Sequence, residues 1–170
     1  MTKTRVTAAV AALLLTLSAC GGGDDDQAAK AISDSIMKEQ EGASADVFKM
    51  KQEEADCIGE GFVSEIGTDQ LQEYGFLTED LKTAEELTNV KMSTADAEAA
   101  ADTLFDCADV QKMMTESMGD LDEKTKTCLE EVMTEDALHD LFTKMFSGKQ
   151  DEAGQELIEP MMKCTAGATQ

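Results

Sequence analysis

The sequence predicts an all-α fold, a small disulfide-stapled helical bundle with a degenerate two-unit internal repeat. Apolar residues recur at helical spacing from about residue 45 onward, and the alternation typical of β-strands is absent. Pro160 is the only proline, so few positions of the chain interrupt a helix. Four of the five cysteines fall in this helical region, and an even number of cysteines in an exported chain indicates two disulfide bonds.

Residues 1–19 are predicted to be a signal peptide. Lys3 and Arg5 give the chain a positively charged start, and residues 6–17 form a largely apolar run. A helix of this length is too short to cross a bilayer. We therefore expect this segment to direct export rather than to remain as a membrane span.

The apolar run ends in a lipidation motif. Residues 17–20 read Leu-Ser-Ala-Cys, which resembles the lipobox of bacterial lipoproteins. The resemblance implies that the thiol of Cys20 receives a diacylglyceryl group and that a signal peptidase cleaves after Ala19. Two acyl chains on one residue give a stable anchor, so we expect the protein on the extracytoplasmic face of the bacterial cell membrane. An ordinary secreted protein with an unmodified Cys20 is the alternative.

Residues 20–44 are expected to form a lipidated acidic tether. The run GGGDDD after Cys20 combines flexible glycines with acids that stay in water and are repelled by anionic lipid. Farther along, several apolar residues share one helical face, but the polar run EQEGASA interrupts the pattern, so the segment predicts at most a marginal or disordered helix. These apolar residues are Ala28, Ala29, Ile32, Ile36 and Met37.

Residues 45–170 are predicted to form the helical domain. Ser93 with Thr94 favours the start of a helix, and Thr78 and Thr134 can cap others. Gly59 and Gly61 interrupt a helical pattern at a cost in stability, which indicates that another helix packs closely there. The expected helices cover residues 51–66, 68–75, 79–88, 94–117 (with a break after Cys107 as the alternative), 121–133, 135–147 and 151–163.

The cysteines divide this domain into two similar units, at about 50–107 and 121–164. Cys57 and Cys128 are each followed by an apolar residue at the next position, a glutamate at the third and an apolar residue at the fifth. Cys107 and Cys164 each come at the end of an expected helix. The apolar residues before Cys107 align without a gap with those before Cys164. In that correspondence Ala100, Ala101, Leu104 and Phe105 match Leu157, Ile158, Met161 and Met162.

The repeat favours the bridges Cys57–Cys107 and Cys128–Cys164, each of which ties the first helix of a unit to its last. In the chain-entropy model such a crosslink contributes about 4 kcal/mol. The nested arrangement, Cys57–Cys164 with Cys107–Cys128, is the alternative. The stretch EADCIGEGFVSEIG at 54–67, together with the cysteine placement, resembles uncharacterised secreted helical proteins of high-GC Gram-positive bacteria. That resemblance implies no activity.

Charge and composition exclude several classes of partner. The formal net charge is −22, and removal of Lys3 and Arg5 with the signal peptide leaves −24 and no arginine. Nucleic acid is excluded, because its phosphates are bound by clustered lysines and arginines. Without an arginine, the mature chain also has no guanidinium group to bind a phosphate or a carboxylate ligand through two hydrogen bonds. Six phenylalanines, one tyrosine and no tryptophan argue against sites that stack on sugars or cage cations.

No catalytic residue is predicted. His139 is the only histidine, it has no serine in a nucleophile-elbow context, and paired cysteines cannot act as nucleophiles. Residues 120–131 place Asp120, Asp122 and Glu131 at the first, third and twelfth positions of a calcium loop. A lysine at the fifth position and a threonine in place of the glycine at the sixth defeat that motif. We expect Asp120 to serve as an acid at a helix N-terminus.

The eleven methionines admit two interpretations. Thioethers select Cu(I), so a copper-handling lipoprotein is the alternative function. The same spacing is typical of a helical core filled by flexible methionine side chains, and we favour that interpretation. The residues concerned are Met113, Met114 and Met118 on one stretch, and Met161, Met162 and Cys164 on another.

Taken together, these patterns predict a lipid-anchored cell-envelope protein without cofactor or catalytic site. Its expected role is that of a binding module that holds an envelope protein or an apolar ligand in a helix groove. The membrane is expected to be a partner only through the lipid at Cys20.

Overall fold

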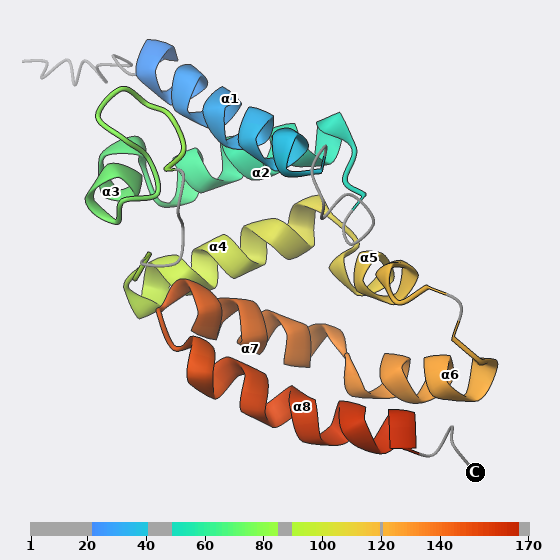
Figure 1. Ribbon diagram of the computed structural model, residues 1–170. Helices are drawn as coiled ribbons and strands as arrows, with labels where there is room; N and C mark the ends of the chain where they lie inside the picture. The colour runs from blue at the N-terminus through green and yellow to red at the C-terminus, as the bar shows by residue number, and fades with distance from the viewer. Residues whose placement is uncertain (1–21, 41–48, 85–89, 120, 167–170) are drawn as a thin grey trace, which may run out of the picture.

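A computed structural model describes residues 22–40, 49–84, 90–119 and 121–166. Within these ranges the chain is helices and loops, with a single isolated β-bridge between Leu77 and Thr83, and the predicted all-α class is confirmed. The helices are α1 Gly22–Glu39, α2 Gln52–Glu65, α3 Thr68–Glu73, α4 Thr94–Cys107, α5 Val110–Ser117, α6 Glu123–Val132, α7 Glu135–Phe146 and α8 Gln150–Ala166 (Figure 1).

The helices form two units in the same order. In the first unit α1 packs on α2 and α2 packs on α4, and in the second unit α5 contacts α6 and α6 packs on α8. Helix α7 lies between α4 and α8 and joins the two units (Figure 1). The units predicted at about 50–107 and 121–164 contain α2–α4 and α6–α8, and α1 and α5 each precede one of them.

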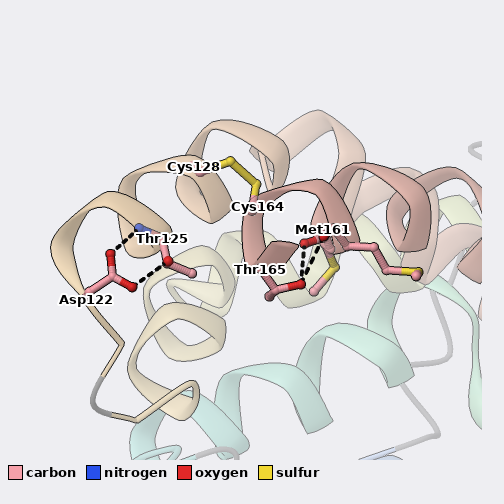
Figure 2. The surroundings of a disulfide bond; sticks show 7 residues. Asp122, Thr125, Cys128, Met161, Cys164 and Thr165 are labelled. Atoms are coloured by element: carbon pink, nitrogen blue, oxygen red, sulfur yellow. Dashed lines mark hydrogen bonds between the residues drawn. A yellow bond between two sulfur atoms is a disulfide. The ribbon is translucent and has the colours of Figure 1, made fainter. Parts of the chain in front are cut away.

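The disulfides follow the repeat. Cys57–Cys107 ties α2 to the end of α4, and Cys128–Cys164 ties α6 to α8 (Figure 2). The Cα atoms of each pair lie 5.6 Å apart, which is the usual separation for a disulfide. The unit-wise pairing is confirmed, and the nested alternative does not occur.

Each unit has its own apolar core. In the first, Ile32, Ile58 and Leu71 are almost completely buried, and the ring of Phe62 packs edge-on against Phe76 and Phe146. Because Phe146 belongs to α7, the second unit contributes directly to the first core. In the second core the buried residues are Leu129, Met133, Leu138 and Cys164.

Helix α1 lies in the segment that was expected to be a tether with at most a marginal helix. Ala28 and Ile32 are almost completely buried against α2, and the Ser33 hydroxyl donates a hydrogen bond to Asp56. A helix with an interrupted apolar pattern is marginal in isolation, and most helical stability in proteins comes from packing of one face. The partner surface on α2 supplies what the local pattern lacks. Cys20 and residues 41–44 lie outside the described residues.

The predicted helix over 79–88 is wrong for the part that the structure describes. Phe76 and Leu77 are buried in the first core, and the chain then turns back, with the Thr78 amide donating to the Lys82 carbonyl. Leu81 at the turn has a positive φ of 55°. Two buried anchors before the turn thus override the local helical preference, and residues 85–88 lie outside the described ranges.

The other helix boundaries follow local capping chemistry. Ser93 accepts a hydrogen bond from the Asp96 amide at the start of α4. At the start of α7, Thr134 accepts a hydrogen bond from the Ala137 amide. The long predicted helix breaks after Cys107, because Ala108 is extended and Asp109 caps a new helix, α5. The alternative that placed a break there is confirmed.

Candidate functional site

His139 lies at the junction of the two units. Its Nε2 atom is 2.8 Å from Oδ1 of Asp102 on α4, and its ring lies 5.6 Å from the ring of Phe105 between centroids. Phe142, one turn farther on α7, packs edge-on against the same phenylalanine. These contacts join α4 to α7, so the arrangement has a structural use that requires no reaction.

We expect His139→Ala to lower the free energy of unfolding by about 1–2 kcal/mol, because the hydrogen bond to Asp102 and the contact with Phe105 are both lost. Urea unfolding followed by circular dichroism measures the change. His139→Gln is the matched control, since its amide can still donate to Asp102 and should recover part of the loss. An alanine variant as stable as the wild type would contradict a junction role for this residue.

The segment that matches part of a calcium loop forms the N-terminal cap of α6 instead. Asp122, not Asp120, is the residue that starts α6: its carboxylate accepts hydrogen bonds from the Thr125 backbone amide, at 3.0 Å, and from the Thr125 hydroxyl, at 2.6 Å (Figure 2). Asp120 lies outside the described residues. The hydrogen bond from the Thr125 hydroxyl, followed by that from its amide, lowers the pKa of Asp122 below the ordinary value of 3.8.

This lowered pKa gives a pH prediction. A carboxyl whose pKa is lower in the folded state contributes stability above its unfolded pKa and loses that contribution as the pH falls through the folded value. Asp122→Asn keeps an acceptor oxygen but cannot titrate. We therefore expect the free energy of unfolding of this variant to fall less below about pH 4 than that of the wild type. Urea midpoints at a series of acidic pH values provide the comparison. If the urea midpoints of the two proteins fall equally as the pH is lowered, Asp122 does not have the lowered pKa assigned to it.

Four methionines belong to the second core, and Met50 and Met92 belong to the first. Met133 is completely buried, and three further methionines pack against the same cluster: Met114, Met118 and Met161. Met162 is different, because 63% of its surface is exposed. Within the ranges that the structure describes, no group of three or more His, Cys, Asp or Glu side chains is placed to hold a metal ion. The copper hypothesis stays a hypothesis without a specific contact in its favour.

Three surface hollows differ in chemistry. One, of about 520 Å³, lies between α1 and residues 82–84 and is bordered by charged groups that include Asp34, Lys38 and Lys82. Another, of about 560 Å³ beside the start of α1, is bordered by acids that include Asp24 and Asp69. The third is smaller, about 200 Å³, and mostly apolar; we call it the α6–α8 groove, and it is lined by Val132, Ala137, Asp140, Ala153, Leu157 and Pro160.

The α6–α8 groove exists because of the kind of residue at each position. Ala137 and Ala153 are small and leave space between α7 and α8, while Leu157 and Val132 supply apolar walls. Pro160 lies inside α8, where it has no amide hydrogen to donate. The sequence could have signalled the groove through its two alanines on facing helices, but only the packing of α8 on α7 brings them together.

The predicted anchor is not part of the described chain. Cys20 and the signal segment lie before Gly22, so their expected roles stay predictions. Across the described ranges, every helix falls short of the length and apolar content needed to cross a bilayer. The four other predicted site residues are all brought together in pairs, as the two disulfides.

The chain was compared with protein-family models, with curated proteins and with solved structures, and none of the three comparisons gave a match.

Proposed function

We propose that this protein is a lipid-anchored module of the bacterial cell envelope that binds another protein without catalysing a reaction. The anchor rests on the Leu-Ser-Ala-Cys motif at residues 17–20 and on the charged and apolar segments before it. The binding role rests on the structure of the second unit.

The observation that carries the binding role is the α6–α8 groove. Its volume of about 200 Å³ is smaller than the roughly 300–1,000 Å³ typical of small-molecule sites, so it suits one apolar side chain of a partner better than a whole ligand. The two disulfides hold α2 to α4 and α6 to α8, so the groove is built on a rigid frame. A preformed groove binds with little loss of conformational entropy.

Two features support a role without catalysis. His139 is engaged with Asp102 and Phe105 at the junction of the units, and the four cysteines of the helical domain are paired as disulfides. An oxidised cysteine has no thiolate with which to attack a substrate. The acids that cap or begin helices, such as Asp122, are already used by backbone amides.

The anchor is tested by intact-mass analysis of protein extracted from membranes of the producing cell. We expect a mass that corresponds to a chain beginning at Cys20 plus a diacylglyceryl group. Cys20→Ser should leave the signal segment uncleaved and remove the lipid mass. An unmodified wild-type protein that is released in soluble form would overturn the anchor.

The binding role is tested by crosslinking in the intact envelope. A photoreactive side chain at Asp140, beside the groove, should yield a crosslinked species with a partner protein. Ala137→Phe fills the groove and should abolish that species, whereas Ala95→Phe, at an exposed position in the first turn of α4, should preserve it. Equal yields in the two phenylalanine variants would rule out the groove as the binding site.

A further inference from the structure

A second surface of α8 carries apolar side chains away from the groove. Ile158 and Met162, one helical turn apart, are 55% and 63% exposed. Glu159 and Lys163 border them and form an exposed ion pair at 2.8 Å. We call these four residues the outer face of α8, and Figure 1 shows α8 at the edge of the molecule, on the side away from α1.

The internal repeat shows what kind of element covers such a face. In the ungapped correspondence, Ile158, Glu159 and Met162 match Ala101, Asp102 and Phe105 of α4. There Ala101 is completely buried, while Asp102 binds His139 and Phe105 packs on Phe142. The equivalent face in the first unit is therefore the one on which a helix of the following unit, α7, packs.

The equivalent face of the second unit is open, because Ile158 and Met162 are more than half exposed among the described residues. Repeat proteins end in capping elements with a polar outer surface when the last unit is to remain in water. Helix α1, on the side of the molecule away from α8, has such a surface, because Asp26, Lys30 and Asp34 are exposed. Ile158 and Met162 have instead kept the apolar character of an interface.

The two ends also restrict how copies of the chain can associate. End-to-end growth would need an apolar surface on the first unit to meet the outer face of α8. The exposed large hydrophobic residues among the described positions all lie in the second half of the chain: Leu121, Met145, Ile158 and Met162. An isologous contact, in which the same face meets its own copy across a two-fold axis, needs no second surface.

The charges of the outer face fit such a contact. When two copies of a helix pack antiparallel about a two-fold axis, the residue one turn ahead on one helix lies opposite the residue one turn behind on the other. An axis near Met161 places Glu159 of one copy opposite Lys163 of the second copy, and the reverse. Met162 of each copy then lies close to Ile158 of the other copy, in an apolar row beside the two charged pairs, and this row is removed from water.

We propose that two copies of this protein associate through the outer face of α8, antiparallel and isologous, with Ile158 and Met162 in an apolar row beside crossed Glu159–Lys163 pairs. This proposal goes beyond the proposed function and does not depend on the α6–α8 groove, which lies on a different side of the helix.

The test uses the full chain in the producing cell, expressed as two copies with different epitope tags and with a photoreactive phenylalanine analogue at position 162. We expect illumination to produce a species that carries both tags and has twice the monomer mass. The same analogue at Glu60, exposed on α2, is the control and should give no such species. Ile158→Asp should reduce the yield about tenfold or more, because a charge replaces a buried apolar side chain.

Charge reversal makes the test specific to the geometry. Glu159→Lys or Lys163→Glu alone places like charges opposite each other and should lower the yield about threefold. The double variant Glu159→Lys with Lys163→Glu restores opposite charges across the axis and should recover the yield. Non-reducing mass analysis confirms that both disulfides form in each variant, so a loss of dimer is not a loss of fold.

The proposal is overturned if position 162 yields no species with both tags, or if Glu60 yields it equally. A double charge reversal that stays as low as the single ones overturns the antiparallel arrangement. A crosslink from position 162 to a different protein alone also contradicts the dimer, while the groove experiment at Asp140 reports separately on the proposed function.

Discussion

Replacement of Cys57 and Cys107 together by alanine is expected to lower the free energy of unfolding by about 4 kcal/mol, and replacement of Cys128 and Cys164 by a similar amount. The residues of the two bridges are separated by 50 and 36 positions, and loop-closure entropy grows only with the logarithm of loop length. The total stability of a domain is typically about 5–15 kcal/mol. Loss of both bridges should therefore leave the protein largely unfolded at physiological temperature.

Urea unfolding of the two pair variants measures these losses. Pairs are replaced together because a single free thiol could exchange with the remaining disulfide. Wild-type protein treated with reductant is the matched control and should show the combined loss of both variants. A pair variant that unfolds at the same urea concentration as the wild type would show that its bridge does not contribute to stability.

Replacement of Gly59 by alanine is expected to cost about 3 kcal/mol, the upper range for an added group in a packed interior. A Cβ atom at this position would collide with the backbone carbonyl of Ala29 on α1. A backbone group cannot move aside as a side chain can, so α1 must shift away from α2. The loss should appear in urea unfolding and as increased proteolysis of α1, whose stability depends on this contact.

Two other glycines provide matched controls for Gly59. At Gly61 the added Cβ would meet the methyl group of Thr103, a side chain, so we expect a smaller loss of about 1–2 kcal/mol. At Gly23 no heavy atom lies within 4 Å, and alanine should stabilise α1 by about 0.5–1 kcal/mol. The ranking Gly59, Gly61, Gly23 follows from the packing alone. Equal effects at the three positions would contradict the described approach of α1 to α2.

Local chemistry explains why several elements could be predicted. Ser93 and Thr134 cap helices in the structure as their residue types favour, and both glycines of α2 lie where another chain segment approaches closely. The matched spacing around the four cysteines also predicted the pairing that the structure has. In each case the determining information lies within a few residues of the chain or in a pattern repeated along it.

The failures have a common cause in long-range packing. Residues 22–39 form a helix with one buried face, where the local pattern predicted at most a marginal helix, because α2 offers a surface. Residues 79–84 form a turn because Phe76 and Leu77 are anchored in the core. Neither the surface of α2 nor the position of the core can be derived from the segments themselves.

The same distinction separates the anchor, the groove and the outer face of α8. The sequence by itself determined the all-α class, the pairing of the cysteines within each unit and the motif on which the proposed lipid anchor rests, because these depend on residue type and spacing along the chain. Only the tertiary structure decided that Ala137 and Leu157 line one groove while Ile158 and Met162 face water. Neighbouring residues of one helix share a sequence pattern, and the helices packed beside them determine which are buried.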